Sequence, residues 1–180
     1  MLEEVGIDYE LVPTSWDGED NRQPEFLAIN PNGKVPALTD GNLVLWESLA
    51  INLFLTQRYG GPLAFRTDRD LAVASRWSFW AMGEFEGPID AVARYDAKLP
   101  QGWAAPALTI LNGTLEESPW LGGDAFGVAD LNVATLFQRP ILAKVDRRPF
   151  PFLNQWLKNC RTRPAFLRMI EIGRAASYQG

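Results

Sequence analysis

The residues whose types and spacing could do chemistry together lie within residues 25–59. Glu47 and Ser48 stand where a predicted strand becomes a helix, and the free N–H groups and positive dipole end of a helix attract a carboxylate. Lys34 and the Val35-Pro36 bond come shortly before this junction. The combination predicts a site for a small ligand that carries acidic groups. Each feature also has an ordinary structural interpretation, as a helix cap, a solvated lysine and a turn.

The residue types that are missing exclude several kinds of catalysis. The chain contains no histidine, so a Ser/His/Asp or Cys/His relay and a histidine-based metal site are excluded. Its single cysteine, Cys160, forms no CxxC pair and no zinc cluster. Any catalysis must therefore use carboxylates, hydroxyls, lysine, the backbone or a thiol that a ligand brings. We predict no metal.

Composition indicates a globular protein, and we expect it in the cytoplasm. Hydrophobic residues make up 47% of the 180, and seven of the residues are tryptophan, which excludes a disordered chain. The net charge of −5 argues against a nucleic-acid partner. No apolar run approaches the roughly 18 residues of a spanning helix, so we expect no membrane association. A lone cysteine fits a reducing compartment.

The first part of the chain, residues 1–59, predicts a small α/β unit. Its last helix is apolar on most of its sides and is expected to be buried. A polar loop is expected at Ser15–Gln23 and a turn at residues 30–33. The predicted elements are the last turn of a helix at Leu2–Glu4 capped by Gly6, a strand at Ile7–Val12, a short helix at Glu25–Ile29 opened by Pro24, a hairpin of Ala37–Asp40 and Leu43–Trp46, and a helix at Glu47–Tyr59.

A Gly/Pro-containing linker, residues 60–67, leads to an all-helical part at residues 68–180. Its longest helix carries two apolar stripes, Trp77/Trp80/Ala81 and Phe79/Met82/Phe85, and both are expected to be covered, chiefly as core. A hydrophobic co-substrate or a dimer partner is the alternative for Trp77, Trp80 and Phe79. Cys160 is expected to be a buried small apolar residue. The predicted helices span Asp68 (as the cap) to about Arg94, Gln101–Glu117, Val128–Phe137, a segment through Phe152 and Cys160, and a last one opened by Pro164.

Two segments, NPNGKVPAL at residues 30–38 and WESLAI at residues 46–51, carry a family resemblance. Weaker support comes from GVADL at residues 127–131 and RPAF at residues 163–166. With these motifs the chain resembles the glutathione transferase superfamily, in its bacterial-type cytosolic branch, over essentially its whole length. The resemblance implies an α/β plus all-α fold: a thioredoxin-like domain, here without its first strand, followed by a helical bundle.

The resemblance also implies a glutathione site made of Lys34, Val35, Pro36, Glu47 and Ser48. In the family pattern the bond before Pro36 is cis, and the backbone of Val35 pairs with the peptide ligand. Ser48 holds the α-carboxylate of the γ-glutamyl group, Glu47 pairs with its ammonium, and Lys34 meets the other terminal carboxylate. Outside the site, Gly127 replaces the family's Ser or Thr cap. Asp130 is therefore expected to bond backbone N–H groups without a reciprocal hydroxyl.

None of these residues matches the Ser, Tyr or Cys that activates the thiol in this family. We interpret the chain as a truncated form and expect the activating residue upstream of Met1. A full-length form is expected to conjugate the glutathione thiolate to small hydrophobic electrophiles in detoxification, as a homodimer. The 180-residue form is expected to bind glutathione weakly or not at all and to conjugate little. A glutathione-dependent isomerase or peroxidase and a non-catalytic module that binds a protein partner remain alternatives.

Overall fold

The computed structural model describes residues 1–15, 19–95 and 98–177. The chain divides into two compact units, one of Met1–Ala64 with Ile170–Gly180 and the other of Phe65–Met169. The second boundary falls inside α10 (Pro164–Ser177), so the two halves of that helix belong to different units. The domain limits drawn from the sequence, 1–59, 60–67 and 68–180, stay predictions.

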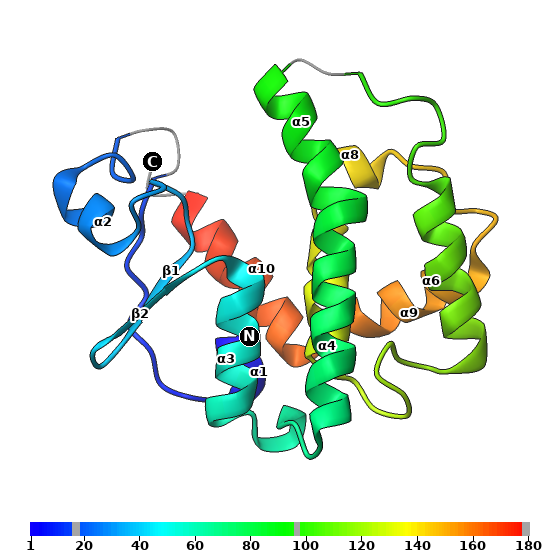
Figure 1. The fold of residues 1–180 in the computed structure, drawn as a ribbon, viewed down its shortest axis with the longest axis horizontal. Helices are drawn as coiled ribbons and strands as arrows, with labels where there is room; N and C mark the ends of the chain where they lie inside the picture. Colours follow the sequence, from blue (N-terminus) through cyan, green and yellow to red (C-terminus); the bar gives the residue numbers. More distant parts are fainter. Residues whose placement is uncertain (16–18, 96–97, 178–180) are drawn as a thin grey trace. The chain divides into compact units, whose positions relative to one another are not determined.

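The first unit contains one hairpin and several helices (Figure 1). The hairpin register pairs Ala37 with Trp46 and Asp40 with Leu43, as predicted. Gly6, with a φ of 67°, caps α1 in the left-handed conformation, and Pro24 opens α2. The elements are α1 (Leu2–Val5), α2 (Pro24–Ile29), β1 (Ala37–Asp40), β2 (Leu43–Trp46), α3 (Ser48–Tyr59) and the 3₁₀ turn η1 (Gly61–Leu63).

Two expectations for this unit are wrong. Residues Ile7–Val12 form no strand: the sheet of the described chain contains β1 and β2 alone, and Leu11 and Val12 are exposed. An extended segment without a partner strand gains no ladder hydrogen bonds, whatever its β propensity. Helix α3 is only partly enclosed, because it buries one line of residues (Ile51, Leu55 and Thr56) and leaves Leu49, Leu53 and Phe54 half-buried. Part of the predicted Ser15–Gln23 loop, at residues 16–18, lies outside the described residues.

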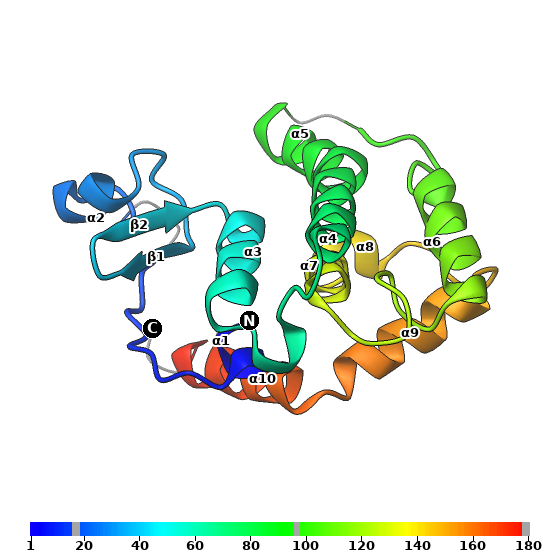
Figure 2. The same ribbon diagram turned by 60° about the horizontal axis from the view of Figure 1, so that its bottom comes forward.

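The second unit is helical in its described part. Helix α4 packs against α7, and α6 packs against α9 (Figures 1 and 2). The predicted start of α6 at Gln101 is wrong, because residues 101–104 form a turn. Helix α8 is too short for a periodic pattern and was not predicted. The helices are α4 (Asp68–Ala81), the π turn η2 (Met82–Glu86), α5 (Gly87–Tyr95), α6 (Ala105–Glu117), α7 (Val128–Leu136), α8 (Pro140–Ala143), α9 (Pro151–Arg161) and the first part of α10.

The long helix runs without a break from α4 through η2 to α5, close to the predicted span. Its cap is Thr67 rather than Asp68: the Thr67 hydroxyl accepts from the Asp70 N–H, and the Asp70 carboxylate accepts from the Thr67 N–H. In η2 the N–H of Gly87 bonds to the carbonyl of Met82, five residues back. Pro88 explains the wide turn, since it has no N–H to give to the carbonyl four residues before it.

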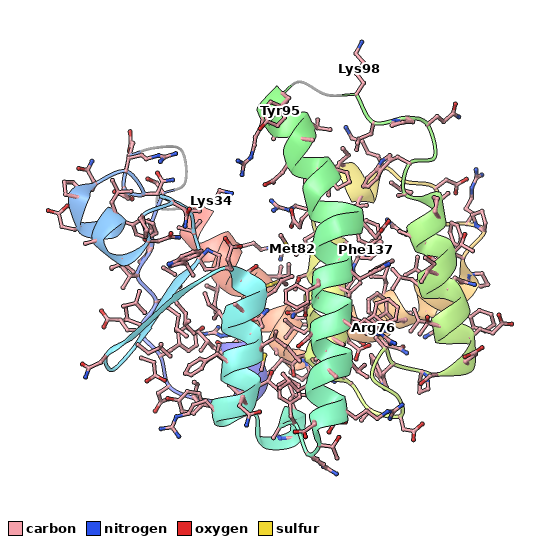
Figure 3. The ribbon with its side chains drawn as sticks, in the orientation of Figure 1. Lys34, Arg76, Met82, Tyr95, Lys98 and Phe137 are labelled. Carbon is pink, nitrogen blue, oxygen red and sulfur yellow. The ribbon has the colours of Figure 1, made fainter. Side chains whose placement is uncertain are left out.

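The π turn changes which side chains are buried. One extra residue in a turn rotates everything after it to another face, so Phe85 no longer shares a face with Phe79. Phe85 is fully buried, whereas Phe79 is 74% exposed and Met82, labelled in Figure 3, is 40% exposed. The expectation that Phe79/Met82/Phe85 form one covered stripe is therefore wrong. The Trp77 and Ala81 stripe is buried, as predicted, and Trp80 is half-buried.

Asp130 joins three segments of the second unit and is fully buried. Its Oδ1 accepts from the Leu121 N–H at 2.9 Å and the Trp156 indole N–H at 2.8 Å, and its Oδ2 accepts from the Gly127 N–H at 3.0 Å. Gly127 has no side-chain hydroxyl that could accept a hydrogen bond in return. The expectation that Asp130 bonds backbone N–H groups without a reciprocal hydroxyl is therefore confirmed. Burial raises the pKa of Asp130 to about 6, and the three donors act in the opposite direction. Cys160 is buried in the hydrophobic core of the second unit, as predicted.

Candidate functional site

The junction between β2 and α3 is the most unusual backbone of the described chain. Glu47, with φ 74° and ψ 108°, is the one non-glycine residue with a positive φ among the described residues. Such a conformation costs roughly 1–3 kcal/mol and persists where the surrounding structure demands it. Here the hairpin ends at Trp46 and α3 begins at Ser48, so one residue must make the whole change of direction.

The N-terminus of α3 is open. The first intrahelical bond runs from the Ile51 N–H to the Glu47 carbonyl, at 3.0 Å. Within the described residues, the N–H groups of Ser48, Leu49 and Ala50 have no partner, and no side chain caps the helix. Glu47 and Ser48 are exposed, and neither side chain makes a hydrogen bond or ion pair in the described part of the chain. These free N–H groups and the positive end of the helix dipole are suited to bind an anion.

Buried asparagines hold the loop that carries Lys34 and Val35. Asn30 is 2% exposed; its Nδ2 donates to the Lys34 carbonyl at 2.6 Å, and its Oδ1 accepts from the Asn32 N–H at 3.0 Å. Asn21, also buried, donates through Nδ2 to the Gly33 carbonyl at 2.8 Å. Gly33 has a φ of 60°, and a Cβ there would lie 2.9 Å from the Asn21 carbonyl oxygen. These hydrogen bonds anchor the loop immediately before Val35.

The Val35-Pro36 peptide bond is cis, as the sequence resemblance implied. Val35 is 41% exposed, and its backbone N–H and C=O have no hydrogen-bond partner within the described residues. An exposed residue whose backbone N–H and C=O are both unpaired can pair with a short peptide in the manner of an added strand. Sequence reasoning predicted Val35 but overlooked the supporting Asn21 and Asn30; the signal for Asn30 was its place at the head of the turn.

The hairpin register brings the predicted residues together. Because Ala37 pairs with Trp46, Pro36 and Glu47 leave the sheet at the same end, next to each other. The Tyr59 hydroxyl donates to Asp40 Oδ2 at 2.7 Å, which ties the far end of α3 to the hairpin and raises the Tyr59 pKa. Lys34, on the loop before β1, is exposed (Figure 3). The structure thus places Lys34, Val35, Pro36, Glu47 and Ser48 on one exposed edge of the first unit.

Comparison with known proteins agrees with this arrangement. The family model "Glutathione S-transferase, N-terminal domain" matches residues 1–57, and "Glutathione S-transferase, C-terminal domain" matches residues 93–164. A relative from Escherichia coli K12, glutathione S-transferase GstB, is 32% identical, with 95% of this chain and 89% of the relative covered. The chain belongs to the glutathione S-transferase superfamily. Its two-stranded sheet with helices and its helical unit fit a thioredoxin-like domain followed by a helical domain.

Other members of the superfamily differ in their named activities and ligands. Disulfide-bond oxidoreductase YfcG, also from Escherichia coli K12, is 31% identical over 92% of this chain and 84% of its own length. A theta class glutathione S-transferase from Xanthomonas axonopodis pv. citri, solved with glutathione bound, is 31% identical. That structure superimposes with a TM-score of 0.75, covering 93% of this chain and 86% of its own.

Neither metal chemistry nor a membrane span has a candidate in the described chain. Residues 1–15, 19–95 and 98–177 contain no group of three or more His, Cys, Asp or Glu side chains that could hold a metal ion. None of the helices within these ranges is long and apolar enough to cross a membrane. The activating residue that we expect upstream of Met1 is not part of this sequence, so this expectation stays a prediction.

Proposed function

We propose that this protein is a glutathione transferase that recognises glutathione through Lys34, Val35, Pro36, Glu47 and Ser48. The observation that carries the proposal is the pairing of Ala37 with Trp46. It sets the unpaired backbone of Val35 beside the open N-terminus of α3. A backbone docking edge next to an anion-binding helix end suits a short peptide with an acidic end.

Each part of glutathione has a matching group on this edge. The Ser48 hydroxyl and the free N–H groups of α3 bind the α-carboxylate of the γ-glutamyl group, and the Glu47 carboxylate pairs with its ammonium. The backbone of Val35 pairs with the central cysteine of the ligand, and Lys34 meets the glycine carboxylate. Lys34, Glu47 and Ser48 are exposed, so all three can be contacted from solvent.

The reaction we propose is thiol conjugation. The glutathione thiol loses its proton to water, the thiolate attacks an electrophilic carbon of a small hydrophobic substrate, and the leaving group departs as a C–S bond forms. Lys34, Glu47 and Ser48 position the thiol, and we assign its activation to none of them. A chlorinated nitroaromatic, which releases chloride, is a suitable probe of this chemistry.

Truncated ligands test the assignment residue by residue. In calorimetric titrations, Ser48→Ala should weaken glutathione binding by about tenfold, as expected for one lost hydrogen bond to a charged group. Ser48→Ala should leave the weaker binding of cysteinylglycine unchanged, because that peptide has no γ-glutamyl group. Lys34→Gln should weaken glutathione but leave γ-glutamylcysteine unaffected, because that peptide has no glycine carboxylate.

A matched control separates recognition from charge. Glu25→Ala removes an exposed acid from the first turn of another helix in the same unit, whereas Glu47→Ala removes the acid at the proposed site. Glu47→Ala should lower retention on immobilised glutathione, and Glu25→Ala should not. Equal retention of the two variants would contradict the assignment of Glu47.

We also propose that the protein forms a homodimer in the cytoplasm. An exposed apolar face on α4 and η2, made of Leu71, Phe79 and Met82, is suited to a second copy. The lone, buried Cys160 is compatible with a reducing compartment.

A second candidate activity is disulfide exchange, which the name of the relative YfcG suggests. The proposed contacts are to the γ-glutamyl, backbone and glycine parts, which reduced and oxidised glutathione share. Titrations with reduced and with oxidised glutathione show which form the protein prefers. Tighter binding of the oxidised form, together with reduction of a disulfide probe, would favour disulfide exchange over conjugation. If the protein binds neither form of glutathione, the result would favour a non-catalytic interaction module.

A further inference from the structure

Two arginines of the second unit are held against the same short stretch of chain. Arg161, the last residue of α9, donates through Nη2 to the Phe137 carbonyl at 3.2 Å. Arg147, in the connection between α8 and α9, donates through Nη1 to the Leu142 carbonyl at 2.8 Å. The Asn154 side chain of α9 donates to the Arg147 carbonyl at 2.6 Å, so the backbone of Arg147 is anchored to the helix that carries Arg161.

No acid balances these two charges in the described chain. Neither Arg147 nor Arg161 forms an ion pair within the described residues. Asp146, the nearest acid in sequence, is bonded to Arg148 at 2.8 Å. Partial burial and then the positive charge of Arg161 lower the pKa of Arg147, so the two guanidinium groups act on each other as like charges.

Both guanidinium groups also have donors to spare. The Nε atoms of Arg147 and Arg161 are buried and have no hydrogen-bond partner within the described residues. Arg147 uses only Nη1, which leaves its side-on edge, Nε and Nη2, without a partner in the described chain. That edge is the pair of parallel donors that binds an oxyanion in bidentate fashion. Capping the carbonyls of Phe137 and Leu142 accounts for one donor on each arginine and leaves the rest unexplained.

The surrounding sequence is strongly basic, although the chain as a whole is acidic. Residues 139–163 contain seven cations and one acid, a net charge of +6, in a chain whose net charge is −5. A local concentration of positive charge attracts small anions and raises their local concentration. The cations are Arg139, Lys144, Arg147, Arg148, Lys158, Arg161 and Arg163.

We propose that Arg147 and Arg161 form a binding site for a phosphate group, separate from the glutathione site of the first unit. The phosphate oxygens accept from the side-on edge of Arg147 and from the spare donors of Arg161. The group is carried either by free inorganic phosphate or by a phosphate monoester.

The arginine Nε–H signals in a ¹H–¹⁵N NMR titration test this site at constant ionic strength. Inorganic phosphate should shift the Arg147 and Arg161 signals together and saturably, and sodium chloride should not. Arg148, which is bonded to Asp146, serves as an internal reference and should shift little. Arg147→Gln and Arg161→Gln should each weaken the phosphate affinity by about tenfold. Lys144→Gln, which removes an exposed charge from the same segment, should change it by less than about twofold.

A second probe, phenyl phosphate, distinguishes the two sources of the phosphate. Equal affinity for both probes supports a site for the free ion, and tighter binding of phenyl phosphate supports a site for a monoester. If a glutamine variant fails to fold, the corresponding lysine variant keeps the charge but loses the paired donors, and a weaker affinity in it supports the proposal. Linear shifts that chloride reproduces, or equal loss of affinity in Lys144→Gln, would overturn it.

Discussion

Replacing Asp130 with asparagine should remove a pH-dependent part of the stability of the second unit. Two physical effects compete at this carboxylate. Burial disfavours its charge, and the three N–H donors from Leu121, Gly127 and Trp156 favour it. Burial is the larger effect and raises the pKa from 3.8 to about 6. The folded protein therefore binds a proton on Asp130 more tightly than the unfolded chain does.

The sign and size follow from linkage. Between the two pKa values the native state holds more protons than the unfolded state, so the contribution of Asp130 to stability decreases as the pH rises. The contribution is fully present below pH 3.8 and is lost as the pH rises through about 6. Integrated from pH 4 to pH 7, the change amounts to about 2 kcal/mol of unfolding free energy.

Urea unfolding followed by tryptophan fluorescence, at several pH values from 4 to 7, measures this term. The stability of the wild-type protein minus that of Asp130→Asn should decrease by about 2 kcal/mol as the pH rises over this range. The chain has no histidine, so no imidazole titrates within the window. Asp124→Asn, which neutralises an exposed carboxylate near the same helix, is the matched control.

A direct reading comes from the indole N–H of Trp156, which donates to Asp130 at 2.8 Å. Its NMR signal should titrate with a midpoint near pH 6. A difference in stability between wild type and Asp130→Asn that stays constant across the pH range, with no titration of Trp156, would refute the reasoning. It would mean that the three donors outweigh burial.

Three further predictions concern the site and the exposed face. Glu47→Gly should raise the unfolding free energy by about 1 kcal/mol, because glycine tolerates a positive φ, while it weakens glutathione binding; thermal unfolding and calorimetry check the two effects. Asn30→Ala should destabilise the first unit by about 1–3 kcal/mol, because it removes the hydrogen bonds of Asn30 to the Lys34 carbonyl and the Asn32 N–H. It should also lower glutathione affinity. Urea unfolding and calorimetry measure the two effects, and an unchanged affinity would contradict the positioning role of Asn30. If the proposed homodimer forms through Phe79, Phe79→Ser should yield a monomer in light scattering with little loss of stability, and a dimer that persists in this variant would exclude this face. Phe85→Ala, by contrast, should lower the unfolding free energy measured in urea by about 3–5 kcal/mol.

Local sequence patterns were sufficient to predict the elements whose formation depends only on their own residues. The hairpin follows from its two short apolar runs around Gly41-Asn42, and Pro24 marks the start of α2. The change from strand to helix between Trp46 and Ser48 was predicted from the WESLAI motif at residues 46–51. The predicted glutathione residues meet because the hairpin register sets Pro36 beside Glu47, and that register is itself local.

The expectations that failed depend on partners distant in the sequence or on backbone details. Ile7–Val12 has strand-like residues, but a strand also needs a neighbour, which the described sheet does not supply. The burial of Phe85 depends on the π turn before Pro88, which changes the helical periodicity after α4, where Phe79 is exposed. The hydrogen bonds of Arg147 to the Leu142 carbonyl and of Arg161 to the Phe137 carbonyl depend on the packing of α7, α8 and α9 and follow from no motif.

The most direct test of glutathione recognition is a ¹H–¹⁵N NMR titration of this chain with reduced glutathione. The amide signals of Val35 and Ser48 should show the largest changes and should saturate together, because these N–H groups are free in the described structure and face the proposed ligand. The same changes should be weaker in Ser48→Ala. Saturable changes confined to other residues, with Val35 and Ser48 unaffected, would contradict the assignment of the site.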